Sequence, residues 1–311
     1  MKLHHKHLMV LVVCILLICL APYVGASPPS DPAVREFVFW QLRIPRVVVG
    51  CLVGGTLGIV GAAFQCVFSN PLATPSTTGT TAGATLGALF AMILFPSLSN
   101  WGLTLFAFIG GLVVAIPVAA LAVRRQSRIE DVLLAGIAFS IAAGAITTGL
   151  QFRADQVTTY RAVQWSLGSL SQNGYEELSV LLPFCGVCIV AVLTQIRSLE
   201  VLVGGEVKAF SQGVSVVAVR TWILVFGSLG VAGCVASCGP IAFVGLVVPH
   251  IVRLTMGNIR RYLIPFSAVV GAGFLAVSDA LARIMPTELP VGVVTASLGA
   301  PLLIFLVLRR T

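Results

Sequence analysis

Residues 239–253 read GPIAFVGLVVPHIVR, an apolar stretch of helix-forming composition into which two prolines, one histidine and one arginine are set. His250 is the only histidine beyond residue 7. The pattern admits three interpretations: a metal or proton site, a substrate gate, or the end of a helix. A metal site needs several ligands, and the stretch contains no acidic residue or cysteine. A metal site is therefore not expected here.

The composition around this stretch indicates a polytopic membrane protein. Of the 311 residues, 58% are hydrophobic and 10% are charged, whereas soluble domains carry about 25% charged residues. Long apolar runs with so little charge are typical of membrane-spanning helices. The net charge of +8 includes only three lysines, and no basic run is interleaved with aromatic residues. Nucleic-acid binding is therefore not expected.

Ten apolar runs predict membrane spans, taking about 20 residues for one crossing. They lie near residues 8–26, 45–66, 79–95, 101–123, 130–150, 178–196, 217–236, 240–256, 262–284 and 291–308. No polar interval between them is long enough for a second folded domain. Residues 1–311 are thus predicted to form one all-α transmembrane domain, with an outer segment at 151–177 and a cytoplasmic loop at 197–216.

Basic residues predict the orientation, because they gather on the cytoplasmic side. With the N-terminus inside, 13 of the 19 lysines and arginines fall on cytoplasmic ends and loops. The outer side holds the other six: Arg35, Arg43, Arg46, Arg153, Arg161 and Arg283. We therefore expect both termini in the cytoplasm. The N-terminus also resembles a signal peptide ending at Ala26; cleavage would leave nine spans in the same orientation, and we expect an uncleaved first span.

This orientation interprets the opening stretch as a short, proline-bounded helix. Gly239 and Pro240 would begin it at the outer side, since proline is tolerated in a first helical turn. Pro249, His250 and Arg253 would lie near its cytoplasmic end, where cations suit the helix dipole. We expect His250 and Arg253 to face loops or a cytoplasmic partner.

Small residues recur every four positions in three spans, and eight cysteines lie within apolar runs. The stripes permit close helix packing in lipid, although small polar residues beside a pathway also leave room for a solute. Cys185 and Cys188 have the only metal-like spacing, but no further ligands accompany them, so packing roles are expected. The stripes are Gly50/Gly54/Gly58/Ala62, Gly79/Gly83/Gly87 and Gly136/Ser140/Gly144/Thr148.

Motifs for catalysis and for energy coupling are missing from the sequence. There is no G-x-x-x-x-G-K-[ST] loop, no G-x-S-x-G elbow and no H-E-x-x-H pair. Asp279 is the only aspartate well inside a span, and its spacing from Arg283 suits an ion pair. Ion-coupled transport needs ionisable groups at membrane depth. We therefore expect a non-enzymatic transport protein driven by a partner, with an ion-coupled secondary transporter of a small solute as the alternative.

Eight motifs together resemble the iron-siderophore, haem and cobalamin permease family (FecCD/BtuC-like), the transmembrane subunits of bacterial ABC importers. The resemblance covers nearly the whole chain and implies a BtuC-like bundle of about ten helices. Ser69, Thr74 and the threonine-rich turn at 77–81 depart from the family pattern and leave the cargo open. The motifs are RIPR (43–46), FQCVFSNPLATP (64–75), TGTTAGA (78–84), WSLGSL (165–170), GEVKAFSQGV (205–214), GPIAFVGLVVPHIVR (239–253), SDALAR (278–283) and ELPVGVVTASLGAPLLIFLVLRR (288–310).

The resemblance implies a set of partners in the bacterial inner membrane. A second permease subunit, identical or different, completes the pathway, and a periplasmic binding protein delivers the cargo. Two cytoplasmic ATPases bind ATP and Mg²⁺, so this chain itself is expected to hold no cofactor or metal and no catalytic residue. The cargo would be a ferric siderophore, the most frequent in the family, or a haem- or cobalamin-type chelate.

The resemblance also implies three functional regions. Charge reversal at Arg43 or Arg46 would weaken binding-protein docking, and bulky residues at Ala209 or Gly213 would uncouple the ATPase. The outer segment 151–177 would lie near the pathway mouth, with Arg153, Arg161 and Trp165. The implied residues are Arg43, Arg46 and Arg283 for docking of the binding protein; Glu206, Lys208, Ala209, Ser211 and Gly213 for ATPase coupling; and Thr80, Thr81, Gly83, Ser140, Gly144, Thr147 and Thr148 for the pathway or gate.

Overall fold

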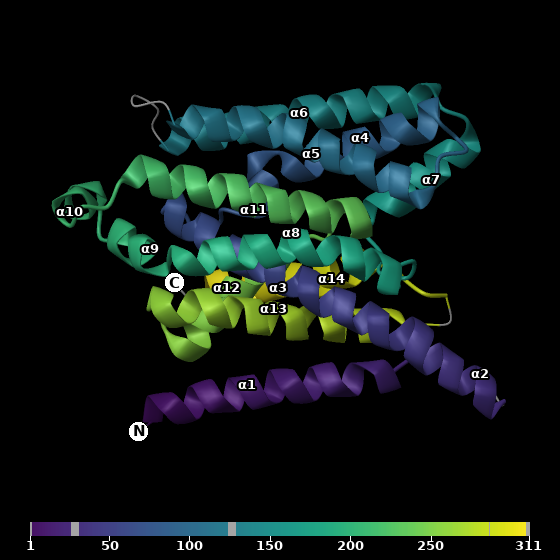
Figure 1. The fold of residues 1–311 in the computed structure, drawn as a ribbon, viewed down its shortest axis with the longest axis horizontal. Helices are drawn as coiled ribbons and strands as arrows, with labels where there is room; N and C mark the ends of the chain where they lie inside the picture. Colours follow the sequence, from purple (N-terminus) through teal and green to yellow (C-terminus); the bar gives the residue numbers. More distant parts are fainter. Residues whose placement is uncertain (1, 26–30, 124–128, 286, 309–311) are drawn as a thin grey trace.

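The fold is a bundle of helices (Figure 1). The computed structural model describes residues 2–25, 31–123, 129–285 and 287–308. In chain order the elements are α1 (Lys2–Leu20), the 3₁₀ turn η1 (Ala21–Tyr23), α2 (Pro32–Phe37), the π-helical segment η2 (Val38–Arg43), α3 (Ile44–Val67), the 3₁₀ turn η3 (Pro75–Thr78), α4 (Thr80–Leu94), α5 (Asn100–Val123), α6 (Ile129–Arg153), α7 (Gln156–Ser166), α8 (Tyr175–Thr194), α9 (Ile196–Val203), α10 (Glu206–Ser211), α11 (Val216–Cys238), α12 (Val244–Met256), α13 (Arg260–Ala282) and α14 (Val291–Leu308).

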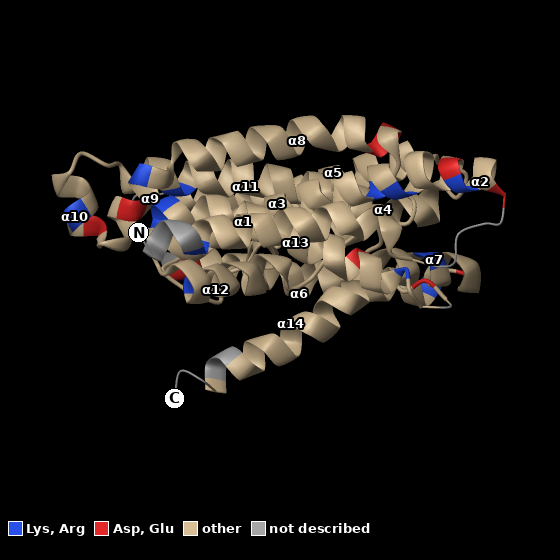
Figure 2. Ribbon diagram, turned by 90° about the horizontal axis from the view of Figure 1, so that it is seen from below, with Lys and Arg blue, Asp and Glu red and all other residues tan. Residues whose placement is uncertain are grey.

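Ten of these elements correspond to the ten predicted spans. Seven helical stretches in the described part of the chain are long and apolar enough to cross a membrane. The shorter apolar helices α4, α12 and α14 fall at the remaining three positions. Figure 2 shows the charged residues gathered mainly at the two ends of the bundle, with an uncharged middle. The prediction of an all-α polytopic membrane protein is confirmed.

The two ends of the bundle differ in the elements that they carry. The start of α1, the end of α14 and the short helices α9 and α10 lie at one end, here called the α10 end (Figures 1 and 2). Helices α2 and α7 lie at the opposite end, the α7 end. An even number of crossings places both termini together, as observed. The side of the membrane that each end faces stays a prediction. Five of the counted arginines and the expected cleavage residue lie outside the described residues: Arg124, Arg125, Arg128, Arg309, Arg310 and Ala26.

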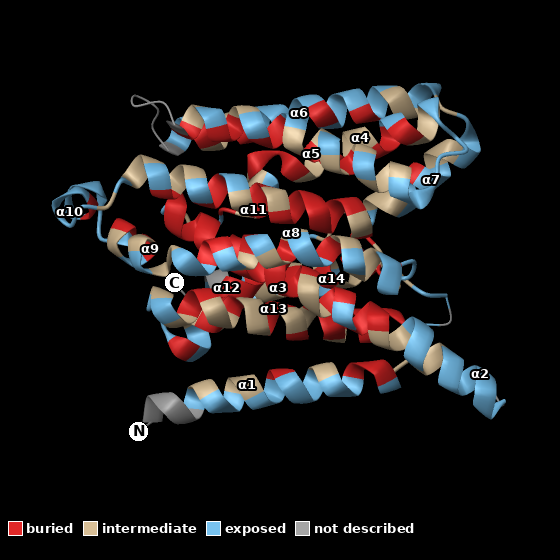
Figure 3. Ribbon diagram, viewed as in Figure 1, coloured by how far each residue is buried: buried red, intermediate tan, exposed pale blue. Residues whose placement is uncertain are grey.

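Helix α3 is central and almost wholly buried, whereas α1 and α6 lie at opposite edges (Figure 3). The glycines of α3 allow the backbones of neighbouring helices to approach very closely. In the stripe of Gly50, Gly54, Gly58 and Ala62, a Cβ atom on Gly54 would lie 2.3 Å from the carbonyl oxygen of Gly271 in α13, and one on Gly58 would lie 2.2 Å from that of Ser267 in the same helix. Since lipid supplies no hydrophobic force between helices, such close contact is a main source of stability. The packing role of this stripe is confirmed.

The expectation that Gly239 and Pro240 begin a helix is wrong. Helix α12 begins at Val244, and Gly239 instead ends α11 with φ +68°. A Cβ atom on Gly239 would lie 2.3 Å from the carbonyl oxygen of Trp165, so only glycine fits this crossing. The dipeptide therefore ends one helix beside the segment that follows α7, and a short non-helical stretch leads into the next.

Candidate functional site

A buried ion-pair network lies at the α7 end. Arg46 in α3 donates from Nε and Nη2 to Oδ1 of Asp279 in α13, at 2.9 and 2.7 Å, and from Nη1 to Oε1 of Glu288 at 2.5 Å. Nε of Arg283 lies 3.1 Å from Oδ2 of Asp279, which confirms the predicted pair. Asp279 is fully buried, Arg46 is 8% exposed and Arg283 is 6% exposed. One buried carboxylate thus serves two buried arginines, and Glu288 supplies the second negative charge.

Arg283 and the neighbouring Arg43 hold the turn η1, which follows α1. Arg283 donates from Nη2 to the carbonyl oxygen of Ala21 at 2.9 Å, and Arg43 donates from Nη1 to that of Pro22 at 3.3 Å. The structure brings the three predicted docking arginines together at one end, but it buries Arg46 and Arg283 and leaves Arg43 half-buried. Docking of a binding protein at these residues stays a prediction, and Arg43 is the most accessible of the three.

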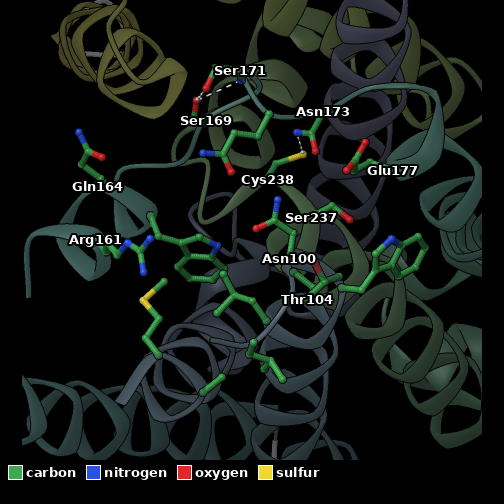
Figure 4. Close-up of a pocket in the computed structure, with 18 of the residues that line it drawn as sticks. Asn100, Thr104, Arg161, Gln164, Ser169, Ser171, Asn173, Glu177, Ser237 and Cys238 are labelled. Atoms are coloured by element: carbon green, nitrogen blue, oxygen red, sulfur yellow. Dashed lines mark hydrogen bonds between the residues drawn. The ribbon is translucent and has the colours of Figure 1, made fainter. Parts of the chain in front are cut away.

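A cavity of about 560 Å³ opens at the α7 end (Figure 4). It lies where α7 and the loop between α4 and α5 meet the start of α8, the end of α11 and residues 288–290. Two side chains of the lining hold their neighbours: Asn173 donates from Nδ2 to Sγ of Cys238 at 3.2 Å, and Oε2 of Glu177 accepts from the backbone N–H of Gly174 at 2.8 Å. The other polar lining residues are Ser97, Asn100, Thr104, Thr158, Arg161, Gln164, Ser169, Ser171, Gln172, Ser237 and Glu288.

Helix α7 places Arg161 and Trp165 on this cavity. Asp155 caps the helix by accepting from the backbone N–H groups of Val157 and Thr158, at 3.1 and 3.2 Å. Hydrogen bonds from Thr158, first from its side chain and then from its backbone, lower the pKa of the Asp155 carboxyl. A lowered pKa means that the cap is fully formed at neutral pH and is lost only as the pH falls through that pKa. The outer segment thus contains a surface helix beside a cavity, and Arg153 does not line it.

The predicted pathway residues fall into a packed group and an open group. Thr80 and Gly83 are buried in α4, where a Cβ atom on Gly83 would lie 2.4 Å from the carbonyl oxygen of Gly110 in α5. In α6, the Oγ atoms of Ser140 and of the buried Thr147 bond to carbonyl oxygens one turn earlier. Thr81 is half-buried.

The open group consists of Gly144 and Thr148 on α6. No atom lies within 4 Å of a Cβ atom built on Gly144, and Thr148 is exposed beside it. Gly136 begins the same stripe and is closely packed: a Cβ atom built on it would lie 2.1 Å from the carbonyl oxygen of Thr77. One stripe is therefore divided between packing and an open face at the edge of the bundle (Figure 3).

Helix α10 projects from its end of the bundle (Figure 1). Arg220 of α11 donates to Oε1 of Glu206 at 2.6 Å, which ties the helix to the bundle. Ala209 is fully buried, so a bulky residue there would also disrupt the chain's own packing. Its role in ATPase coupling stays a prediction. Sequence reasoning missed the exposed apolar residues Val207 and Phe210, which are 87% and 84% exposed. Lys208, Ser211 and Gly213 are also exposed.

The polar residues of α12 bind within the chain. Pro249 has no N–H, and the carbonyl oxygen of Gly245 accepts from Nε2 of Gln65 at 3.4 Å. Arg253 donates from Nη2 to Oε1 of the same glutamine at 2.5 Å, and Nδ1 of the buried His250 lies 2.9 Å from the carbonyl oxygen of Leu246. The two Gln65 contacts fasten α12 to α3, whereas the His250 contact stays within α12. The expectation that His250 and Arg253 face loops or a cytoplasmic partner stays a prediction.

Four cysteines pack between α8 and α11. Cys185, Cys188, Cys234 and Cys238 are buried, and Sγ of Cys185 lies 3.6 Å from Sγ of Cys234. Across the described residues, no group of three or more histidine, cysteine or acidic side chains is arranged to hold a metal ion.

Comparison with known proteins gives a family from the sequence and similar transporters from sequence and structure. Residues 8–309 match the model of the FecCD transport family. The cobalamin import system permease protein BtuC of Halobacterium salinarum is 36% identical over 90% of this chain and 75% of its own. The Fe(3+) dicitrate transport system permease protein FecD of Escherichia coli is 37% identical over 88% of this chain and 86% of its own. A solved metal-chelate type ABC transporter in an inward-facing conformation aligns with a TM-score of 0.87 at 28% identity, covering 97% of this chain and 99% of the other.

Proposed function

The chain belongs to the FecCD transport family, and from this premise we propose that it carries a ferric siderophore, or a haem- or cobalamin-type chelate, from the periplasm to the cytoplasm. It is a multi-pass permease of the ABC transporter type. The observation that best supports the cargo class is that relatives 36–37% identical over about nine-tenths of the chain are named as cobalamin and ferric dicitrate permeases. The bacterial inner membrane is the compartment that this transport requires.

The energy in this proposal comes from two cytoplasmic ATPases, which bind ATP and Mg²⁺ and dock at the α10 end. The apolar side chains of Val207 and Phe210 support this location, because apolar groups on a projecting helix suit a partner's groove better than water. A second permease subunit, identical or different, would face Gly144 and Thr148 of α6 and complete the pathway. A periplasmic binding protein would dock at the α7 end.

Reconstituted vesicles test this function directly. The chain is assembled with its ATPase and binding protein, with the ATPase facing the vesicle lumen and ATP enclosed there. Uptake of a radiolabelled ferric chelate into the vesicles is then measured. We expect uptake only when ATP and the loaded binding protein are both present, and none with an ATPase that lacks its phosphate-loop lysine. Uptake driven by a proton or sodium gradient without ATP would instead establish the secondary transporter.

Phe210→Asp is expected to uncouple the ATPase from transport. Burying a phenylalanine contributes about 1.5–3 kcal/mol, so loss of that contact should weaken ATPase docking by roughly 10- to 100-fold. Co-purification of the ATPase and uptake into vesicles are the measurements. Gln212→Asp adds the same charge at an exposed position two residues away and is expected to retain both. Equal losses in the two variants would assign the effect to charge and not to the apolar contact.

Arg43→Glu is expected to weaken docking of the binding protein by about tenfold at low salt, with a smaller effect at high salt, since exposed charge pairs are screened. Arg46→Glu does not test docking, because the new carboxylate would be buried beside Asp279. Arg153→Glu makes the same charge change at an exposed position of the same end. Binding-protein affinity in these two variants is compared; an unchanged affinity in Arg43→Glu rules out its docking role.

A further inference from the structure

The start of α1 and the turn that joins α12 to α13 carry positive charge at the α10 end. Lys6 lies in the first half of α1, and Arg260 and Arg261 begin α13. Figure 2 shows lysines and arginines gathered beside the start of α1 at this end. The sequence contains no aspartate or glutamate at residues 1–30 or 207–278. The elements that carry these cations therefore supply no negative charge of their own.

Contact between α1 and α13 brings the cations to one surface. The ring of His7 lies 4.5 Å from that of Tyr262, measured between their centroids. His7 follows Lys6 and Tyr262 follows Arg261, so this aromatic contact sets the two cationic residues near each other across the seam between the helices. Both cationic side chains are exposed, whereas Arg260 is half-buried. Lys6, Arg260 and Arg261 are called the basic surface below.

No carboxylate of the chain balances the basic surface. None of the ion pairs among the described residues involves Lys6, Arg260 or Arg261. Arg260 donates to the carbonyl oxygen of Asn258, a neutral group. Glu200 belongs to α9, which also packs against α13, but it is exposed and joins none of these pairs. The first turn of a helix also disfavours cations, so an anion from outside the chain is the group that would stabilise them.

The surroundings of the basic surface are those of a lipid boundary. Helix α1 lies at the edge of the bundle opposite α6 (Figure 3), and Leu8 and Met9 are exposed close to Lys6. Leu254 of α12 and Ile259 before α13 are exposed apolar residues as well. Helix α10, where the ATPase is proposed to dock, projects beyond α9 and α11 and away from α1 (Figure 1). Cations beside exposed apolar side chains match the boundary between phosphate groups and acyl chains.

We propose that the basic surface binds the headgroup of an anionic phospholipid. The guanidinium group of arginine suits this ligand, because it bonds two phosphate oxygens at once. A zwitterionic lipid carries the same phosphate, but its own ammonium group cancels the charge. The bound lipid bridges α1 and α13, with its acyl chains along the exposed apolar side chains of α1. The site depends neither on the cargo nor on the side of the membrane that the α10 end faces.

Native mass spectrometry of the permease–ATPase complex tests the site by counting bound lipids. The complex is stripped of lipid in detergent and titrated with phosphatidylglycerol, which is anionic, or with phosphatidylcholine, which is zwitterionic and has the same acyl chains. We expect phosphatidylglycerol to bind at least about tenfold more tightly, because each basic side chain near the headgroup adds to the attraction. In Lys6→Gln/Arg261→Gln its affinity should fall to that of phosphatidylcholine. Arg153→Gln/Arg197→Gln removes two exposed cations elsewhere and should keep the preference.

Each other outcome overturns the proposal. Equal affinities of the wild type for the two lipids mean that the surface does not select charge, and equal losses in the two double variants assign the effect to net charge. Competition by excess inorganic phosphate would assign the surface to a free anion. Loss of the ATPase from Lys6→Gln/Arg261→Gln, with the lipid preference kept, would make it a protein interface. If that variant fails to fold, Arg261→Gln alone should lower the affinity for phosphatidylglycerol several-fold, and an unchanged affinity is equally decisive against the site.

Discussion

Asp279→Asn is expected to destabilise the folded permease by about 3–5 kcal/mol, the usual result of removing one partner from a buried ion pair. Asp279 is fully buried and is the carboxylate with which both Arg46 and Arg283 form ion pairs. Asparagine keeps a similar shape and one acceptor oxygen but carries no charge. The two guanidinium groups would then repel each other in a setting that solvates them poorly.

The position of Asp279 makes this loss global. Arg46 belongs to α3, Arg283 ends α13, and Arg283 also holds the carbonyl oxygen of Ala21 at the end of α1. Failure of the network should therefore loosen three helices at the α7 end together. The free energy of unfolding, measured by titration of the detergent-solubilised protein with sodium dodecyl sulfate, is the direct readout.

Glu288→Gln is the matched control, because it removes the other carboxylate that bonds Arg46. The Glu288 side chain is 43% exposed, so water can replace part of its interaction, and exposed pairs contribute about 0–1 kcal/mol. We expect a small effect at Glu288 and a large one at Asp279. Equal effects would mean that the network is solvated, and that burial does not set its strength.

The fold was predictable where it depends on apolar length, and less so where it depends on local backbone geometry. Runs of apolar residues located the seven described helical stretches that are long and apolar enough to cross a bilayer, and also the three shorter apolar helices. Length and low charge alone determine such runs. The start of α12 was misplaced by several residues. As a sequence pattern, Gly239 and Pro240 fit the first turn of a helix as well as they fit the end of the preceding one. Only the close approach of the Trp165 carbonyl oxygen shows that glycine is needed there to end α11.

Contacts of the site within one helix were predictable from the sequence, whereas contacts between distant segments were not. The pair of Asp279 and Arg283 followed from a four-residue spacing, since such residues share a helix face. The bond from Arg46 to Glu288 joins residues 242 positions apart, and no local spacing indicates it. The exposure of Phe210 was likewise hidden, because an apolar residue in a loop is more often buried. The sequence signal for this exposure is weak: Val207 and Phe210 are apolar residues three positions apart in the otherwise short and mostly polar segment 206–211.

Gly61→Val is expected to prevent stable folding, whereas Gly144→Val is expected to leave the fold intact. A Cβ atom on Gly61 would lie 2.0 Å from the carbonyl oxygen of Gly245 and 2.6 Å from its Cα atom, so two helix backbones would have to separate. Overpacking costs about 1–3 kcal/mol where side chains can yield, and backbone atoms yield less. We expect loss of monodisperse protein on size-exclusion chromatography for Gly61→Val and a normal profile for Gly144→Val.

Gly144→Val then separates packing from transport on the same kind of residue. Nothing lies within 4 Å of a Cβ atom on Gly144, so valine meets no clash there, and its helix propensity is higher than that of the glycine it replaces. If the open face of α6 borders the cargo pathway, the three added carbon atoms narrow it beside Thr148, and chelate uptake should fall several-fold while ATP hydrolysis continues. Chelate uptake by Gly144→Ala, which adds one carbon atom, should lie between that of the valine variant and that of the wild type. Normal uptake in the folded valine variant would place this face against lipid and remove Gly144 from the pathway.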